Sequence, residues 1–333
     1  SAASDVYKRQ TYKRNKSKPR GTLPPVPFQM LTALNLDGDA WAQIAKNGSS
    51  QQVRQNLNTF ARHGVFDKDK HNKDRHIRSV AAKLRDPAAI ARARAMPYQL
   101  LTTWQAAGDA IPGAIRDALQ DAMEIAVQNV PQLPGNIVVC PDVSGSMQSP
   151  VTGYRAGATS KTRCIDVAAL ISAAVLRHNP QARVIPFEMV TVNVRLNPRD
   201  SIMTNAQKLA NIGGGGTVCS APLTLLNREK ADVDLVVIVS DNESWADLGQ
   251  YWGGKTGLMK EWDILKQRCP EAKLVCLDIQ PYTTAQAQNR RDILNIGGFS
   301  DQVFTLIGSF AEQGMGTDFW VEEIEKTELA AVN

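Results

Sequence analysis

The sequence places one carboxylate and two hydroxyl groups at alternate positions of a short segment: Asp142, Ser144 and Ser146. Two later segments offer further oxygen ligands. A run of four glycines is followed by Thr217, and Asp241 comes shortly after a strongly apolar run. Hard oxygen ligands of this kind suit Mg²⁺ or Mn²⁺. Because the loop supplies only one carboxylate, we expect coordination positions to remain for water and for an incoming anion. We therefore predict a divalent-metal site formed by these five residues.

This combination resembles the metal-ion-dependent adhesion site of von Willebrand factor A domains. The DxSxS pattern alone is common. Here it occurs together with a glycine-rich loop that ends in threonine and with a strand-end aspartate, in the order of that family. The other interpretation treats the DxSxS segment as an ordinary turn and the four glycines as a linker. The resemblance implies a bound metal whose open position accepts an acidic side chain from a protein partner.

The elements that would position these residues follow residue 135, where short apolar segments alternate with helical patterns. We expect strands at Asn136–Cys140, Ala182–Phe187, Val233–Val239, Lys273–Ile279 and Val303–Leu306, and helices at Thr162–Arg177, Asp200–Ile212, Trp262–Cys269 and near the C-terminus. Continuously apolar strands that alternate with helices indicate a parallel sheet buried on both faces. Ligand sites in such doubly wound sheets lie beyond the carboxyl ends of the strands, where the metal ligands are expected.

The first part of the chain has a different, all-helical pattern. We expect helices at Phe28–Leu36, Trp41–Ala45, Val53–Phe60, His76–Leu84, Pro87–Arg94, Tyr98–Ala107 and Ile115–Val130. Short helices in series are typical of HEAT-like repeats, although no clean internal period is visible. The segment PQLPG at Pro131–Gly135 marks the boundary. The fold class is thus a helical-repeat segment (22–130) followed by a mostly parallel α/β domain (136–310), with a basic tail (1–21) and a C-terminal helix or tail (311–333).

Charge is divided unevenly along the 333 residues. The net charge is +5, but residues 1–130 hold 20 Lys and Arg against 11 Asp and Glu, and the remainder holds 18 against 22. A polyanionic partner would therefore bind the first part. Five cysteines, odd in number and without CxxC spacing, disfavour a disulfide framework or zinc site and favour the cytoplasm. We also expect no membrane span and no signal peptide, because the long apolar segments of either are missing. The basic tail is expected to be disordered or an artefact of truncation or sequencing, and a nucleic-acid-binding arm is the alternative.

Several further segments resemble the Ro ribonucleoprotein family, which joins a TROVE domain, a ring of helical repeats, to a von Willebrand A domain. They are ARARAMPY at Ala91–Tyr98, the segment Ile137–Met147, DNESW at Asp241–Trp245, and Gly297–Phe299. The resemblance extends from about Leu23 to Phe310 and is to the bacterial type. The family's TROVE domain has roughly twice as many helices, so its N-terminal part is expected to be missing here. The family's Y RNA contacts lie largely in that part and cannot be transferred to individual residues.

A cluster of basic residues in the helical segment is the candidate RNA surface. Its members fall within 27 positions: Lys68, Lys70, Lys73, Arg75, His76, Arg78, Lys83, Arg85, Arg92 and Arg94. Lys and Arg bind phosphates with a strong dependence on salt. At helical spacing Arg75, Arg78 and Arg85 share a face, and a solvated helix face explains the same pattern equally well. The Ro resemblance shifts the interpretation towards RNA binding.

These patterns together predict a non-enzymatic RNA-binding scaffold. The Ro resemblance implies Y-like or misfolded small RNA as ligand, a role in RNA quality control, and an exoribonuclease or another protein with an exposed acidic side chain as partner. Two rivals stay open. One is a metal-dependent adhesion or chaperone-like module that binds protein alone. The other is a metal-dependent phosphate-ester hydrolase, which needs a general base that the sequence does not reveal.

Overall fold

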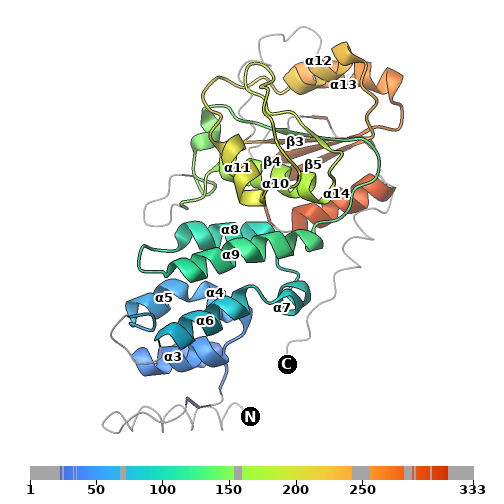
Figure 1. Ribbon diagram of the computed structural model, residues 1–333. Coiled ribbons are helices and arrows are strands. Elements are labelled where there is room, and N and C mark those ends of the chain that lie inside the picture. Colours follow the sequence, from blue (N-terminus) through green and yellow to red (C-terminus); the bar gives the residue numbers. More distant parts are fainter. Residues whose placement is uncertain are drawn as a thin grey trace. The chain divides into compact units, whose positions relative to one another are not determined.

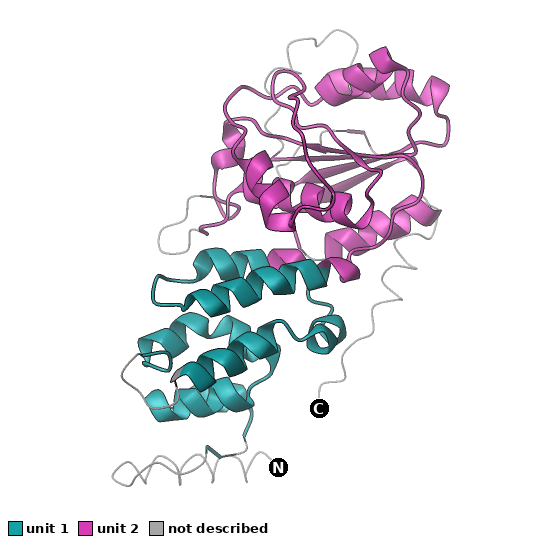
Figure 2. Cartoon of the chain, viewed as in Figure 1, with its two compact units in different colours: residues 1–95, 100–126 teal, residues 96–99, 127–333 magenta. Residues whose placement is uncertain are grey.

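The computed structural model describes residues 23–24, 26–32, 34, 36–67, 73–153, 160–241, 256–280, 287–288, 290–300 and 302–313 (Figure 1). The chain divides into two compact units, residues 1–95 with 100–126, and residues 96–99 with 127–333 (Figure 2). Within the described ranges, every helix is too short or too polar to cross a lipid bilayer. The basic tail predicted at 1–21 lies outside these ranges.

The first unit is helical. Its elements are α2 (Phe28–Thr32), α3 (Gly38–Asn47), α4 (Ser50–Gln55), α5 (Leu57–Arg62), α6 (Lys73–Leu84), α7 (Pro87–Arg92), α8 (Pro97–Ala106) and α9 (Gly113–Ala126). Local capping explains several of their starts. Asp37 accepts a hydrogen bond from the Ala40 amide at 3.0 Å and so caps α3. Asp86 caps α7, with Pro87 in its first turn, as the sequence predicts.

The core of this unit lies between packed helices. Helix α9 buries one face at spacings of three and four residues, formed by Ile115, Ala118, Leu119, Ala122, Met123 and Ala126. It packs against α6 and α7, and α6 in turn contacts α3 and α4. An aromatic cluster extends this core, because Phe60 meets both Trp41 and Phe66 edge to face. The predicted all-helical character of this segment is confirmed.

The second unit is built on a five-stranded sheet. Its strands are β1 (Ile137–Pro141), β2 (Arg183–Val184), β3 (Leu235–Ser240), β4 (Lys273–Asp278) and β5 (Ile293–Gly297). They lie in the order β2-β1-β3-β4-β5, and every neighbouring pair is parallel. Strands β1 and β3 are buried along their whole length, which explains why they are continuously apolar.

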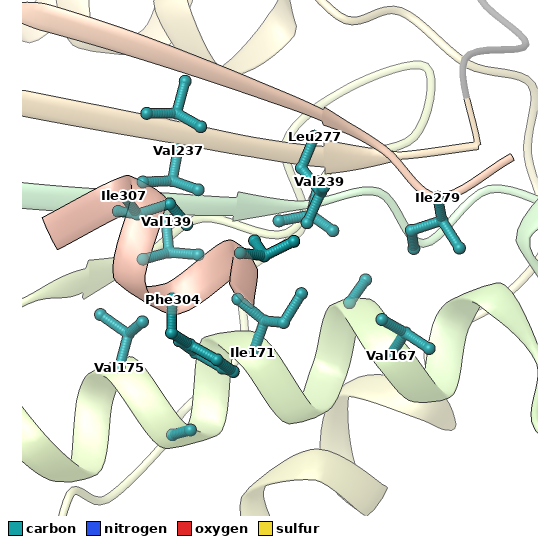
Figure 3. Close-up of a cluster of buried hydrophobic side chains, with 14 of the residues drawn as sticks. Val139, Val167, Ile171, Val175, Val237, Val239, Leu277, Ile279, Phe304 and Ile307 are labelled. Atoms are coloured by element: carbon teal, nitrogen blue, oxygen red, sulfur yellow. The ribbon is translucent and has the colours of Figure 1, made fainter. Parts of the chain in front are cut away.

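Helices cover both faces of this sheet. They are α10 (Cys164–His178), α11 (Ile202–Ala210), α12 (Ala221–Glu229), α13 (Gly257–Arg268) and α14 (Gln302–Gln313). On one face, Val139 and Val237 pack with Ile171 of α10 and Phe304 of α14 (Figure 3). The alternate strand residues face the other way, towards α12 and α13, where Trp262 is fully buried. This is the doubly wound arrangement that the sequence predicts.

One predicted strand is wrong. Val303–Leu306 lies within α14, and the fifth strand is Ile293–Gly297, which we did not predict. A four-residue apolar run does not distinguish a strand from one side of a helix. The wider pattern does, because Val303, Phe304, Ile307 and Phe310 are all buried and lie at helical spacing.

Candidate metal centre and basic helix surface

The predicted metal ligands lie where the direction of the strand connections reverses. Strand β1 lies between β2 and β3, so the chain passes first to one side of β1 and later to the other. In doubly wound sheets this reversal opens a crevice at the carboxyl ends of the two strands. Asp142 directly follows β1 and Asp241 directly follows β3. Both therefore stand at the same edge of the sheet.

Short hydrogen bonds organise the DxSxS segment. One carboxylate oxygen of Asp142, Oδ1, accepts the amide N–H of Ser144 at 2.8 Å. The other, Oδ2, accepts the hydroxyl of Ser240 at 2.7 Å, so the end of β3 is tied to the loop after β1. The hydroxyl oxygens of Ser144 and Ser146 are 3.2 Å apart. The two serines thus present their oxygens together, as the alternate spacing predicts.

Backbone hydrogen bonds join this loop to the glycine-rich loop. The amide of Gly145 donates to the carbonyl oxygen of Gly215 at 3.0 Å. Thr217 follows two residues later and is buried, as are Asp142, Ser144 and Asp241. Ser146 is half-buried. The structure therefore gathers the three predicted segments at one edge.

Two buried acidic side chains, Asp142 and Asp241, lie close together at this edge of the sheet. Burial raises the pKa of Asp142 to about 6. Hydrogen bonds from Ser144 and Ser240 act in the opposite direction, and the nearby charge of Asp241 is a smaller contribution to the raised value. Repulsion between two neighbouring buried carboxylates is relieved either by protonation of one of them or by a nearby cation.

The donor set fits a divalent ion held partly by hydroxyl groups. Each carboxylate oxygen of Asp142 accepts one hydrogen bond in the contacts described above, and a carboxylate oxygen has more than one lone pair. Over the described part of the chain, no three His, Cys, Asp or Glu side chains gather as a metal site. A metal here would consequently depend on Ser144, Ser146 and Thr217, in keeping with Mg²⁺ or Mn²⁺ as the ion.

Two residues near this edge were not predicted. Ser240 holds Asp142, and its signal was present in the sequence as a polar residue that ends an apolar strand. Glu188 accepts the amide of Gly215 at 2.7 Å. Nothing in the local sequence marks Glu188, since the contact joins segments 27 residues apart. Of the DNESW segment, only Asp241 belongs to the described residues, and residues 242–245 lie outside them.

The basic cluster of the first unit has an exposed stripe on α6. Arg75 and Arg78 are exposed, and Arg85 continues the stripe just beyond the helix. The opposite side of α6 carries the buried Val80 and Leu84. Arg85 also pairs with Asp121 at 3.1 Å in a half-exposed ion pair. The predicted common face is therefore present, with Arg85 partly engaged.

Two members of the cluster face inward. Lys83 donates hydrogen bonds to the carbonyl oxygens of Ala45, Lys46 and Gly48, with the contact to Gly48 at 2.8 Å. Its ammonium group thus caps the C-terminal end of α3, where a positive charge is favourable. His76 is half-buried, and burial lowers its pKa, with smaller contributions from Arg75 and Lys46. Lys83 therefore makes contacts within the helical unit, and its place in the RNA surface stays a prediction.

The remaining members divide between exposed residues and residues outside the described ranges. Arg92 and Arg94 are exposed at the end of α7, and Arg94 adopts a φ of +44°, which residues other than glycine rarely do. Lys68 and Lys70 lie outside the described residues, as does the side chain of Lys73.

Comparisons with known proteins agree on one family. A family model described as the Ro60 vWA domain matches residues 136–311. The RNA-binding protein RO60 of Deinococcus radiodurans is 30% identical over 280 residues, which cover 81% of this chain and 50% of the relative. A Caenorhabditis elegans protein of the same name is 23% identical over 253 residues, which cover 71% of this chain and 37% of the relative. This chain thus spans half or less of each relative.

A solved structure shows the same architecture. The crystal structure of the Deinococcus radiodurans RO (RSR) protein matches with a TM-score of 0.65 and 26% sequence identity. The match covers 85% of this chain and 59% of that one. It therefore extends over both units of the chain.

Proposed function

This chain belongs to the Ro60 family, and we propose on that premise that it is a non-enzymatic RNA-binding scaffold. The observation that carries the proposal is the exposed arginine stripe of α6, Arg75 and Arg78 with Arg85 beyond it. Two similar proteins are named RNA-binding proteins. Since this chain spans only part of their length, RNA binding by this segment needs its own test.

The basic stripe favours recognition of the RNA backbone. Guanidinium groups on one side of a helix neutralise successive phosphates and release counterions, so affinity falls as salt rises. Phosphate contacts position an RNA without reading its bases. The ligand would thus be a small RNA selected by shape, such as a Y-like or misfolded RNA. This is the kind of ligand that a role in RNA quality control requires.

The second unit would hold a protein partner through a metal ion. Asp142, Ser144, Ser146, Thr217 and Asp241 would bind Mg²⁺ or Mn²⁺, and such an ion supplies an electrophilic centre for a carboxylate. The role of the chain is to fix these oxygens and to leave part of the coordination sphere open. The buried charge of Asp142 beside Asp241 supports a cation there. An exoribonuclease with an exposed Asp or Glu is the partner that fits this proposal.

The position of the single histidine in the second unit argues against a histidine general base at the proposed metal site. The second unit contains a single His in the sequence, His178 at the C-terminal end of α10. Cys164 lies at the other end of the same helix. Burial is the main cause of its raised pKa, and the nearby charges of Asp241 and Asp142 also contribute. A helix of 15 residues is roughly 20 Å long. His178 is therefore too far from the site to act there as a general base.

Fluorescence anisotropy with the full chain tests RNA binding. The probe is a fluorescein-labelled hairpin RNA with a single-stranded tail, titrated between about 50 and 200 mM salt. We expect saturable binding. The logarithm of the association constant should fall linearly with the logarithm of the salt concentration. A DNA hairpin of the same sequence is the control for general polyanion binding, and RNA should bind more tightly.

The alternative is an adhesion module that binds protein alone. The contact of Lys83 with the carbonyl oxygen of Gly48 favours this alternative, because it engages one positive charge of the basic surface within the helical unit. Absence of RNA binding at low salt would refute RNA binding by this segment and leave the protein-only module as the surviving interpretation.

A phosphatase assay with p-nitrophenyl phosphate, in Mg²⁺ and in EDTA, tests hydrolysis separately. EDTA-sensitive turnover would contradict a purely binding role.

A further inference from the structure

Glu188 holds the glycine-rich loop at two points, once through its side chain and once through its backbone. The carboxylate of Glu188 accepts the amide of Gly215 at 2.7 Å. The backbone carbonyl oxygen of Glu188 accepts the amide of Val218 at 2.9 Å. Only Gly216 and Thr217 lie between these two anchors. The backbone that carries the proposed ligand Thr217 is thus fixed on both sides by the same residue.

The contact continues into the DxSxS segment. Gly215, held by Glu188 through its amide, accepts the amide of Gly145 with its carbonyl oxygen at 3.0 Å. Gly145 lies between the proposed ligands Ser144 and Ser146. Glu188 is therefore linked through one glycine to both hydroxyl-bearing loops of the site.

The carboxylate of Glu188 lies close against Gly215. A Cβ atom added at residue 215 would lie 2.7 Å from Oε2 of Glu188, so a larger residue there would displace this carboxylate from its contact. Met189 packs beside the next glycine in the same way, with its sulfur 3.0 Å from the position of a Cβ on Gly216. The Glu188–Met189 segment thus forms the surface on which the glycine-rich loop rests.

We propose that Glu188 is a positioning residue of the metal site. Four consecutive glycines give a loop with unusual conformational freedom, so an external contact must hold Thr217 in place. A carboxylate suits this task, because its hydrogen bonds to backbone amides are stronger than those of a neutral acceptor. Glu188 itself binds no metal in this proposal. The inference rests on the proposed metal site, whereas the ordering of the loop is independent of it.

Calorimetric titration of the full chain with Mn²⁺ tests the effect on metal binding. Glu188→Ala removes the acceptor, and we expect affinity to fall about tenfold or more, as for other residues that orient metal ligands. Glu188→Gln keeps an oxygen that can accept the Gly215 amide, so it should restore most of the affinity. Glu229→Ala is the matched control, because Glu229 is an exposed carboxylate paired with Arg183, and it should bind Mn²⁺ like the parent.

Hydrogen exchange without metal tests the ordering separately. The amides of Gly215 and Gly145 should exchange faster in Glu188→Ala than in the parent, and Glu188→Gln should protect them again. Parent-like Mn²⁺ affinity in Glu188→Ala would overturn the proposal. An equal loss of Mn²⁺ affinity in Glu188→Gln would also overturn it, because the charge of Glu188 rather than its hydrogen bond would then be what matters. Faster exchange together with no Mn²⁺ binding by the parent would refute the metal site, and with it the role of Glu188 there, while leaving its ordering of the loop demonstrated.

Discussion

Ser240 donates its hydroxyl hydrogen to Asp142 across 2.7 Å, although 98 residues separate the two in the chain. The hydrogen bond joins the last residue of β3 to the first residue after β1. It occupies one oxygen of Asp142, while the amide of Ser144 occupies the other. The rotation of the carboxylate is therefore fixed before any ligand arrives. This preorganisation makes Asp142 the residue on which the proposed metal site would depend.

Asp142→Asn should abolish Mn²⁺ binding while the second unit stays folded. The amide has nearly the shape of the carboxylate and can still accept the Ser144 amide, but it lacks the charge that holds a cation. Calorimetric titration and a thermal melt measure the two effects. Asp200→Asn is the control, since Asp200 forms a partly exposed pair with Lys208 in the same unit. Parent-like metal affinity in a folded Asp142→Asn protein would refute the assignment.

Replacing both Arg75 and Arg78 by Ala should weaken RNA binding and flatten its dependence on salt. Each lost phosphate contact lowers the log–log slope by about 0.7–0.9, so two contacts lower it by roughly 1.4–1.8. Anisotropy over a range of salt concentrations measures the slope. The matched control replaces Arg195 and Arg199, two exposed arginines of the other unit. An unchanged slope would show that the α6 stripe is only a solvated surface.

Lys83→Met should destabilise the helical unit without changing the salt dependence of RNA binding. The variant keeps most of the apolar stem but leaves the carbonyl groups of Ala45, Lys46 and Gly48 without their donor. We expect a loss of about 1–3 kcal/mol in the free energy of unfolding, measured in urea. Arg85→Met, which breaks only the exposed pair with Asp121, should cost less than about 1 kcal/mol. A reduced salt slope at parental stability would instead place Lys83 in the RNA contact.

Asp292 should contribute stability that is lost in acid. Burial alone would raise its pKa, but hydrogen bonds from Arg290 and Trp262 outweigh burial and hold the pKa below its usual value. The unfolded chain therefore takes up the proton first as pH falls. The contribution is complete above the unfolded pKa of about 3.9 and disappears as pH drops through the lower folded value.

The melting temperature measured from about pH 5 down to about pH 2 checks this expectation. Asp292→Asn should melt earlier than the parent at pH 5 and lose less stability on acidification. Asp200→Asn, at a more exposed pair, should follow the parental curve closely. Equal acid sensitivity in Asp292→Asn and the parent would assign the effect to other carboxylates.

Much of the architecture was predictable because it depends on neighbours in the chain. The apolar runs that form β1, β3 and β4 can be recognised by composition, because strands buried on both faces are apolar along most of their length. Asp86 and Pro87 start α7 through bonds within one turn. The alternate spacing of Asp142, Ser144 and Ser146 likewise brings their polar groups together locally. A parallel sheet then places the ends of its strands at one edge.

Other features were decided only by tertiary packing. The partners of Asp142, Glu188 and Lys83 lie 98, 27 and up to 38 residues away, and no local pattern selects them. The segment Val303–Leu306 has the composition of a strand, yet it is helical because its apolar residues continue at helical spacing and pack on α10 and the sheet. Lys83 belongs to the same basic run as the exposed arginines around it. The approach of the C-terminal end of α3 decides its contacts, because carbonyl groups at a helix end lack partners within the helix and accept from the Lys83 ammonium group.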